Sequence, residues 1–361
     1  MRHRIRLSSR RALGTLSAEI QSLEPRTLPA GTVTASLSGG SITLTGDKQD
    51  NAIAIQMTPT GVFVQSTDGS TTIKLGAQST TDGSPVKLAA GPKVFQDLII
   101  NLNDGNDTVY IFANSFPLGA VGVAAAVEAP LEATIGRNLK INTGRGNDGV
   151  VVFAVGGRLT VGNDMTVELG SGDDLLFLYG AISEPPSDLP AGPPTPQVNP
   201  LHVTGNAKIN GGAGNDVIQV FGVSTGKDLQ IETFNGNDQV IVVNSSIGGN
   251  VGISTGGDDD FVVASDVAVF GRSSITTGNG NDHVEIHNAY SRGNVSVRLD
   301  QGNDTLDVSG NLSVGKNATV TLDGGDGRNE IDTFNTDNPD SDLARRAMII
   351  AFEEFGASPA G

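Results

Sequence analysis

The feature that most constrains the fold of this chain is a short Gly-rich turn that recurs at a fixed interval. The turn ends in an aspartate at eight places: Asp107, Asp148, Asp174, Asp216, Asp238, Asp260, Asp282 and Asp304. From Asp216 onward the spacing is 22 residues, four times in succession, and Asn329-Glu330 is a degenerate further copy. Such a period indicates a repeat protein in which each unit stacks on its neighbours.

Apolar residues alternate with polar ones on both sides of each turn. In one repeat Leu229 and Ile231 precede the turn, and Val240 and Val242 follow it. Period-two alternation of β-branched residues predicts strands. A fixed turn at a fixed period favours coiling in one direction over a hairpin meander. The sequence therefore predicts an all-β, right-handed parallel β-helix or β-roll with coils of 22 residues.

The number of faces of this solenoid stays open at the sequence level. Two short strands and two turns nearly fill each repeat, which fits a flattened two-sided roll. A third short face is indicated by extra apolar residues outside the two strands: Ile247, Val267, Val269 and Leu312.

We expect four segments along the chain. Residues 1–30 are a basic export or anchoring segment without fixed structure, and residues 31–96 form an N-terminal β cap or irregular coils. Residues 97–335 form the solenoid, interrupted by insertions at 116–131 and 181–200. Residues 336–361 are predicted to form a capping helix and tail, because Asp340 to Asp342 resembles a helix start, Gly356 a stop, and apolar residues between them have helical spacing. A docking helix for another protein is the alternative.

Composition excludes several classes of function. The chain has no Cys, so it holds no disulfide and no thiolate metal site. The net charge is −17, although residues 1–30 carry six Arg against two Glu. An acidic body repels phosphate backbones, so no nucleic-acid partner is expected. No apolar run is long enough for a transmembrane helix.

The aspartate of each turn requires an explanation beyond chain reversal. Gly and Asn tolerate positive φ and are sufficient to bend the chain. Ionised carboxylates stacked about 4.8 Å apart would repel one another by roughly 3–4 kcal/mol at an effective dielectric near 20. A cation between adjacent turns would remove this penalty, and Ca²⁺ suits carboxylate and carbonyl oxygens best. We therefore predict that all eight aspartates are Ca²⁺ ligands. Turn chemistry alone is the alternative.

One turn in particular matches a known calcium-binding repeat. The nine residues from Gly211 to Gln219, Gly-Gly-Ala-Gly-Asn-Asp-Val-Ile-Gln, fit the RTX (haemolysin-type) pattern, and 143–148 and 277–282 are looser copies. Residues 97–330 thus resemble RTX β-rolls, although the motif comes once per 22 residues instead of every nine. The resemblance implies that Asp carboxylates and turn carbonyls hold Ca²⁺ between stacked turns.

The N-terminus carries a second resemblance. The segment from Ser17 to Glu19, followed by Leu23-Glu24-Pro25-Arg26-Thr27-Leu28-Pro29-Ala30, resembles a signature near the start of predicted extracellular proteins of planctomycete bacteria. It implies an extracellular or cell-surface location. An apolar core of the kind that a secretory signal requires is missing, so a disordered basic tail is the alternative.

No catalytic motif accompanies the repeats, and no catalytic residues are predicted. His283, Glu285 and His287 share the outer face of one strand and form either a solvated surface or a zinc site. The sequence favours a non-enzymatic extracellular structural or adhesion module, with calcium ions and a cell-surface polysaccharide or protein as partners. The alternative is a carbohydrate-active enzyme, a polysaccharide lyase or hydrolase, for which Arg298 and Asp300 near Glu285 are the nearest candidate residues.

Overall fold

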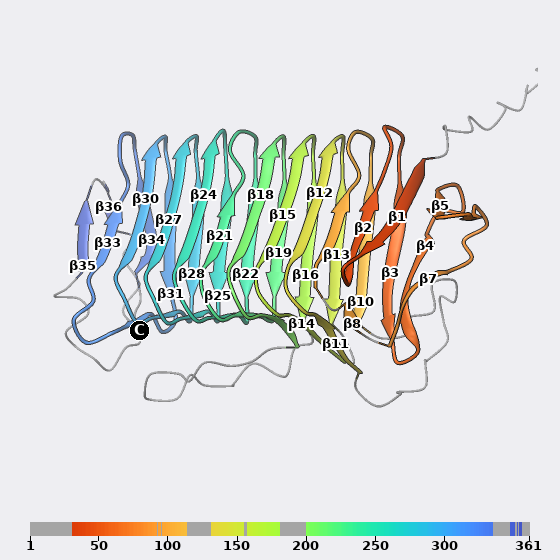
Figure 1. Ribbon diagram of the computed structural model, residues 1–361. Helices are drawn as coiled ribbons and strands as arrows, with labels where there is room; N and C mark the ends of the chain where they lie inside the picture. The colour runs from red at the N-terminus through yellow and green to blue at the C-terminus, as the bar shows by residue number, and fades with distance from the viewer. Residues whose placement is uncertain are drawn as a thin grey trace, which may run out of the picture.

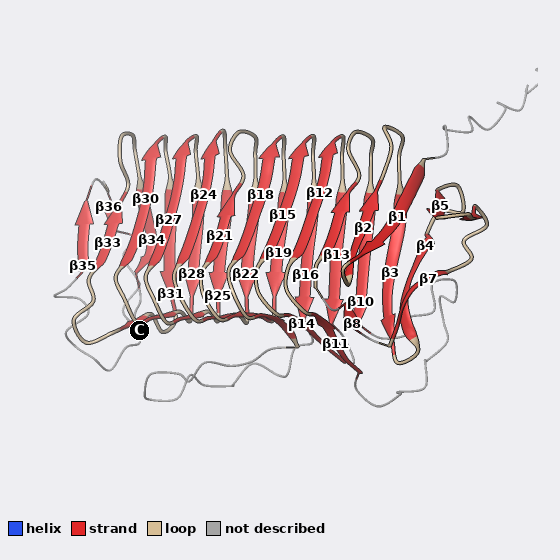
Figure 2. Ribbon diagram, viewed as in Figure 1, coloured by secondary structure: helices blue, strands red, loops and turns tan. Residues whose placement is uncertain are grey.

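A computed structural model gives the fold of the chain. It describes residues 31–91, 93–94, 96–113, 131–154, 157–180, 200–334, 347–350, 352 and 354–355. These residues are all strand, turn or loop, with no helix among them (Figure 2). The described part of the chain therefore contains no helix that could cross a membrane. The basic segment 1–30 lies outside the described residues, as do nearly all of the insertions predicted at 116–131 and 181–200.

The described residues form a three-sided solenoid, which answers the question that the sequence left open. Each complete coil contributes one strand to sheet A, the next to sheet B and a short one to sheet C, and then returns to sheet A. Sheets A and B run along the two broad faces, with their strands pointing in opposite directions, and sheet C lies along the lower edge in Figure 1. The predicted extra apolar residues belong to this third side, since Ile247 and Val269 lie in its strands.

Sheet A has 14 strands in the described residues. In spatial order they are β6 (Gln78–Thr80), β5 (Thr72–Leu75), β1 (Thr32–Ser38), β2 (Ser41–Thr45), β9 (Leu98–Asn101), β12 (Leu139–Arg145), β15 (Met165–Ser171), β18 (Ala207–Ala213), β21 (Leu229–Glu232), β24 (Val251–Gly257), β27 (Ser273–Asn279), β30 (Val295–Gln301), β33 (Val320–Asp323) and β35 (Ala347–Ile350). From β2 to β35 every neighbouring pair is parallel.

Sheet B has 13 strands within the described ranges. They are β7 (Val86–Ala90), β4 (Gly61–Ser66), β3 (Ala52–Thr58), β10 (Thr108–Ala113), β13 (Gly149–Ala154), β16 (Leu175–Gly180), β19 (Val217–Phe221), β22 (Gln239–Val243), β25 (Phe261–Ser265), β28 (His283–His287), β31 (Thr305–Ser309), β34 (Glu330–Phe334) and β36 (Glu354–Phe355). Val240 of β22 pairs in register with Ile218 before it and Val262 after it, so equivalent residues of successive repeats form columns.

Sheet C is the narrowest side, with nine strands in the described part. They are β8 (Lys93–Val94), β11 (Leu131–Ile135), β14 (Gly157–Val161), β17 (Leu201–Val203), β20 (Val223–Thr225), β23 (Ser246–Ile247), β26 (Ala268–Val269), β29 (Tyr290–Ser291) and β32 (Ser313–Val314). All of its strand pairs are parallel.

The core is a thin column of aliphatic side chains enclosed by the three sheets. Inward residues such as Val240, Ile231 and Ile247 are fully buried, while the residues between them face solvent. Because successive strand residues point to opposite faces, the sequence alternation fixes which side of each strand is buried.

The N-terminal end is closed by antiparallel hairpins. β1 pairs with β2, β3 with β4 and β7 with β4, all antiparallel, so the N-terminal end does not present the bare edge of a parallel coil. Parallel coiling begins at β2 and β3, which pair with β9 and β10. Asn51, directly before β3, takes the position that Asp occupies in later coils.

The capping helix predicted at the C-terminus is wrong for the described part of that segment. Residues 347–350 form β35 on β33, and residues 354–355 form β36 on β34. Ile349 packs against the core, whereas Met348 and Ile350 are 54% and 40% exposed. A strand is favoured because β33 presents an edge of backbone N–H and C=O groups that only another strand can satisfy along its length. Residues 335–346 lie outside the described chain.

Candidate functional site

The turn between sheet A and sheet B carries the predicted metal ligands, and the structure brings all eight into one column. The members of this Asp column are Asp107, Asp148, Asp174, Asp216, Asp238, Asp260, Asp282 and Asp304, each at most 3% exposed. Asn51 precedes the column, and Asn329 ends it. The side chains point into the corner of the solenoid and not into solvent, which the sequence did not indicate.

One oxygen of each carboxylate has a structural role. The backbone N–H of Asp107 donates to Oδ1 of Asp148 in the next coil at 2.7 Å, and that of Asp216 donates to Oδ1 of Asp238 at 2.8 Å. The same bond recurs at every step of the column, between 2.7 and 3.0 Å. Each carboxylate therefore satisfies a buried backbone donor of the preceding coil, which is a reason for an acceptor at this position that needs no metal.

A second ladder runs beside the column in the opposite direction. It consists of the residue just before each aspartate, which is exposed at the turn. Asn237 donates its N–H back to Oδ1 of Asn215, and Asp259 donates to Oδ1 of Asn237, at 2.8 and 3.0 Å. The Asn and Asp of each turn thus connect a coil to both of its neighbours. This pair of ladders explains why the two residues occur together.

The other oxygen of each column carboxylate, Oδ2, is buried and has no hydrogen-bond partner among the described residues. It faces the residue five positions earlier: a Cβ added to Gly211 would lie 2.4 Å from Asp216 Oδ2. In four coils that earlier residue is Thr, and its hydroxyl donates to a carbonyl of the next coil, as Thr143 does to Leu169 at 2.8 Å. The carboxylates are therefore half satisfied.

Burial dominates the electrostatics of the column. It raises the pKa of Asp174 to about 8 and that of Asp107, Asp216 and Asp260 to about 7, and hydrogen bonds from neighbouring backbone and side-chain groups only partly oppose it. The pKa of Asp304 is raised to about 6 for the same reason. Neighbouring carboxylates raise these pKa values further, but as a smaller cause than burial. The mutual repulsion predicted from the sequence is thus the lesser part of the penalty.

The glycines of these turns bring the backbones of successive coils close together. Gly212 and Gly214 have φ values of 105° and 130°, a region that favours glycine. A Cβ on Gly212 would lie 1.7 Å from Gly170 O, and one on Gly214 would lie 2.0 Å from Gly172 O, so these carbonyls point at the next coil. Within the described residues, no group of three His, Asp or Glu side chains could hold a metal ion by itself. A cation here would need carbonyl oxygens as well as carboxylates.

The His-Glu-His cluster does not converge on one point. His283 Nε2 lies 3.0 Å from Glu285 Oε1 and its ring stacks on Phe261, whereas His287 Nδ1 lies 3.1 Å from Ser309 Oγ in the next coil. The three side chains contact different groups and do not face a common point, so the structure gives the zinc alternative no support.

The residues suggested as a catalytic group lie on different sides of the solenoid. Arg298 is an outward residue of β30 in sheet A and pairs with Asp300, whereas Glu285 lies on β28 in sheet B. The neighbour of Glu285 is Asp307, its register partner in β31. Arg298 and Asp300 are therefore not part of a site with Glu285.

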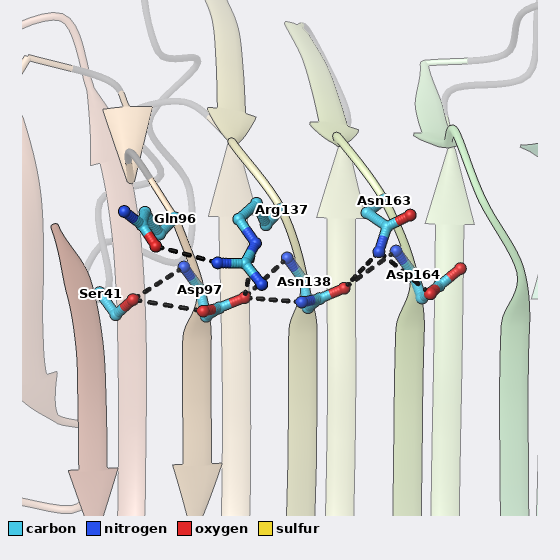
Figure 3. Close-up of polar contacts among 7 residues, drawn as sticks. All are labelled: Ser41, Gln96, Asp97, Arg137, Asn138, Asn163 and Asp164. Atoms are coloured by element: carbon cyan, nitrogen blue, oxygen red, sulfur yellow. Dashed lines mark hydrogen bonds and ion pairs between the residues drawn. The ribbon is translucent and has the colours of Figure 1, made fainter. Parts of the chain in front are cut away.

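The turn between sheet C and sheet A carries a third ladder, which the sequence analysis missed. Figure 3 shows its beginning: Asn138 N and Nδ2 donate to Asp97 Oδ1 at 3.2 and 2.7 Å, and Asp164 N donates to Asn138 Oδ1. Arg137 adds an ion pair to Asp97. The ladder continues through Asn206, Asp228 and Asn250. Each member stands ten residues before an aspartate of the Asp column, so the same period could have revealed it.

Comparison of the chain with protein-family models, curated proteins and solved structures finds no match. A function is therefore inferred from the geometry of the turn between sheets A and B and of the turn between sheets C and A.

Proposed function

We propose that this protein is a non-enzymatic extracellular structural or adhesion β-solenoid whose Asp column binds Ca²⁺. One observation carries the proposal: eight stacked carboxylate oxygens are buried without a hydrogen-bond donor in the described chain. An ionised carboxylate in such a place is costly unless a cation or a proton neutralises it. A divalent cation between coils would neutralise the carboxylates of two neighbouring turns together.

The ligands would come from two coils. Oδ2 of adjacent column members, such as Asp174 and Asp216, would supply carboxylate oxygen. The carbonyls of Gly170 and Gly172, which point toward the next coil, would supply the remaining oxygens. Ca²⁺ accepts such mixed oxygen ligands. Bound ions would stiffen the stack, which suits a rod that presents or spaces a binding surface. The extracellular location rests on the N-terminal resemblance and on the millimolar Ca²⁺ that weak sites require.

The test is a Ca²⁺ titration of the full chain after removal of metal with a chelator. Circular dichroism and thermal melting should show a rise in Tm at millimolar Ca²⁺, and Mg²⁺ should have a smaller effect because it requires a stricter octahedral shell. No change of either signal would contradict the proposal and would leave protons as the only neutralising species.

A matched pair of variants separates the column from general charge effects. Asp216→Asn removes one column carboxylate, and Asp259→Asn removes the same charge from the exposed ladder beside it, where most coils already have Asn. The proposal requires that Asp216→Asn reduces the Ca²⁺-induced rise in Tm and that Asp259→Asn does not.

A carbohydrate-active enzyme remains the second candidate because of one observation on the outer face of sheet B. Glu285 and Asp307 are register partners on adjacent strands, and His283 contacts Glu285. Adjacent parallel strands lie about 4.8 Å apart, close to the separation of about 5 Å between the two carboxyls of retaining glycosidases. A screen on acidic and neutral polysaccharides would test it. Activity that is lost in Glu285→Gln would favour the enzyme.

A further inference from the structure

The ladder between sheet C and sheet A is interrupted at one position, and a basic hollow lies there. Asp228 and Asn250 occupy the ladder position in two successive coils, but the next coil has Arg272 and the one after it Asn294. Arg272 still donates its N–H to Asn250 Oδ1 at 2.9 Å. Its own side chain has only donors and cannot accept the N–H of Asn294.

The break leaves one backbone donor without an acceptor among the described residues. Each preceding ladder residue from Asn138 to Arg272 donates its N–H to the side chain one coil earlier, and Thr319 does the same to Asn294 Oδ1. For the Asn294 N–H, the described part of the chain supplies no such acceptor.

A surface hollow of about 570 Å³ opens at this break. Arg272, Arg292 and Lys316 line it together with Asn294, and all four are exposed. Arg272 extends over the neighbouring coil, since a Cβ on Gly293 would lie 2.9 Å from Arg272 Cγ. Within the described ranges, neither guanidinium has an ion-pair partner.

The charge of this hollow is opposite to that of the protein. The chain carries a net charge of −17, yet three cationic side chains meet here. The nearest carboxylate of the ladder is Asp228, two coils before Arg272, or about 10 Å along the axis at the usual strand spacing. Guanidinium groups and a free backbone N–H are the donors that proteins use for carboxylate, sulfate and phosphate.

We propose that this hollow binds an oxyanion group carried by a small molecule or a sugar unit, through Arg272, Arg292, Lys316 and the N–H of Asn294. The oxyanion accepts the hydrogen bond that an Asn or Asp side chain accepts at this position in other coils, and the guanidinium groups neutralise its charge. The volume of the hollow is in the range of sites for small-molecule ligands and is larger than a single ion would occupy. The site is at the opposite end of the sheet A strands from the Asp column and does not depend on Ca²⁺.

The experiment is isothermal titration calorimetry of the full chain at low ionic strength with a chelator present, so that Ca²⁺ plays no part. The probes are inorganic sulfate, inorganic phosphate and an oligogalacturonate, with a neutral dextran oligomer as control. The wild type should bind at least one anionic probe and not the dextran. Tighter binding of the oligogalacturonate than of the free ions would identify a sugar-borne carboxylate as the ligand.

Arg272→Asn is the decisive variant because it restores the ladder residue of other coils. It should weaken anion binding at least tenfold while raising Tm, since the Asn294 N–H regains an acceptor. Arg292→Gln should weaken binding as much without raising Tm. The control is Arg137→Gln, because Arg137 lies at the equivalent turn of another coil and pairs with Asp97; this variant should bind as the wild type does. Wild-type affinity in Arg272→Asn, or no binding of any anionic probe, would overturn the proposal.

Discussion

The backbone N–H of Asp216 donates to Oδ1 of Asp238 in the following coil at 2.8 Å. This bond makes the carboxylate of one repeat part of the turn of the repeat before it. It also assigns different roles to the two oxygens, because Oδ1 supports the backbone and Oδ2 is buried with no hydrogen-bond donor in the described part of the chain. The chemistry of the column follows from Oδ2, whereas the Oδ1 bonds explain why the column is continuous.

Asp216→Asn should leave the protein as stable as the wild type or more stable when Ca²⁺ is absent at neutral pH. The column itself provides the precedent: Asn329 occupies the same place, and its Nδ2 donates to Gly324 O at 2.8 Å. Gly211 stands at the position of Gly324 relative to Asp216, so the new amide has the same acceptor. Urea unfolding in a chelator should show a gain of about 1 kcal/mol.

Asp216→Ala is the contrasting change at the same site. It removes the acceptor of the Asp174 N–H, now bonded at 3.0 Å, and leaves a buried donor unsatisfied. The expected loss in the free energy of unfolding is about 1–3 kcal/mol. Equal stabilities of the Asn and Ala variants would show that the Oδ1 bond contributes little.

The sequence was sufficient to predict the solenoid because each repeat is locally consistent. The alternation of Val240 and Val242 and the recurring turn point to the same coil, and Ile247 indicates the third side that the structure confirms. The C-terminal helix was wrong for the described residues because the segment carries two apolar periods: Met348 and Phe352 have helical spacing, whereas Ala347 and Ile349 alternate as in a strand. The free edge of β33 decides between the two, and a single sequence does not show that edge.

The candidate site was only partly predictable. Periodicity identified all eight members of the Asp column, but it could not show that they face inward or that burial is the largest cause of their raised pKa values. The third ladder was missed because Asn206, Asp228 and Arg272 are different residue types at equivalent positions. Their common property is their place in the coil, which becomes clear only when the coils are stacked.

Without Ca²⁺, stability should fall as pH rises from about 4 to 8. The pKa values of Asp107, Asp216 and Asp260 are raised from 3.8 to about 7 in the folded chain. Between those values the folded state holds protons that the unfolded state has released, so raising the pH favours unfolding. The contribution is complete below about pH 4 and is lost above the folded pKa. Melting curves in a chelator at about pH 4.5, 6 and 8 would measure it.

The matched check on this pH dependence is Asp216→Asn, which removes one of the titrating groups. Its Tm should decline less steeply over the same range than that of the wild type. A wild-type Tm that rises from about pH 4.5 to 8 in the chelator would contradict the assignment of buried, protonated carboxyls to the column.

Gly256→Ala and Gly252→Ala in β24 should have opposite consequences. Gly256 has a φ of 108°, and a Cβ there would lie 1.8 Å from Phe234 O of the preceding coil. Strain and steric overlap should cost more than about 2 kcal/mol of stability. A Cβ on Gly252 meets no atom within 4 Å, so that variant should stay within about 0.5 kcal/mol of the wild type. Chemical denaturation of both would show whether the close approach of the coils limits substitution.

Ala264→Val should stabilise the solenoid by filling a gap in its core. A cavity of about 40 Å³ lies among Val242, Ala264 and Ile286, and Ala264 is the small member of a column that otherwise carries Val220, Val242 and Ile286. At about 24 cal/mol per Å³, filling this volume is worth about 1 kcal/mol. Val220→Ala, which opens a gap two coils earlier in the same column, should cost about 2 kcal/mol. Thermal or urea unfolding of the two variants would compare them, and a loss of stability in Ala264→Val would mean that the gap is too small for two further methyl groups.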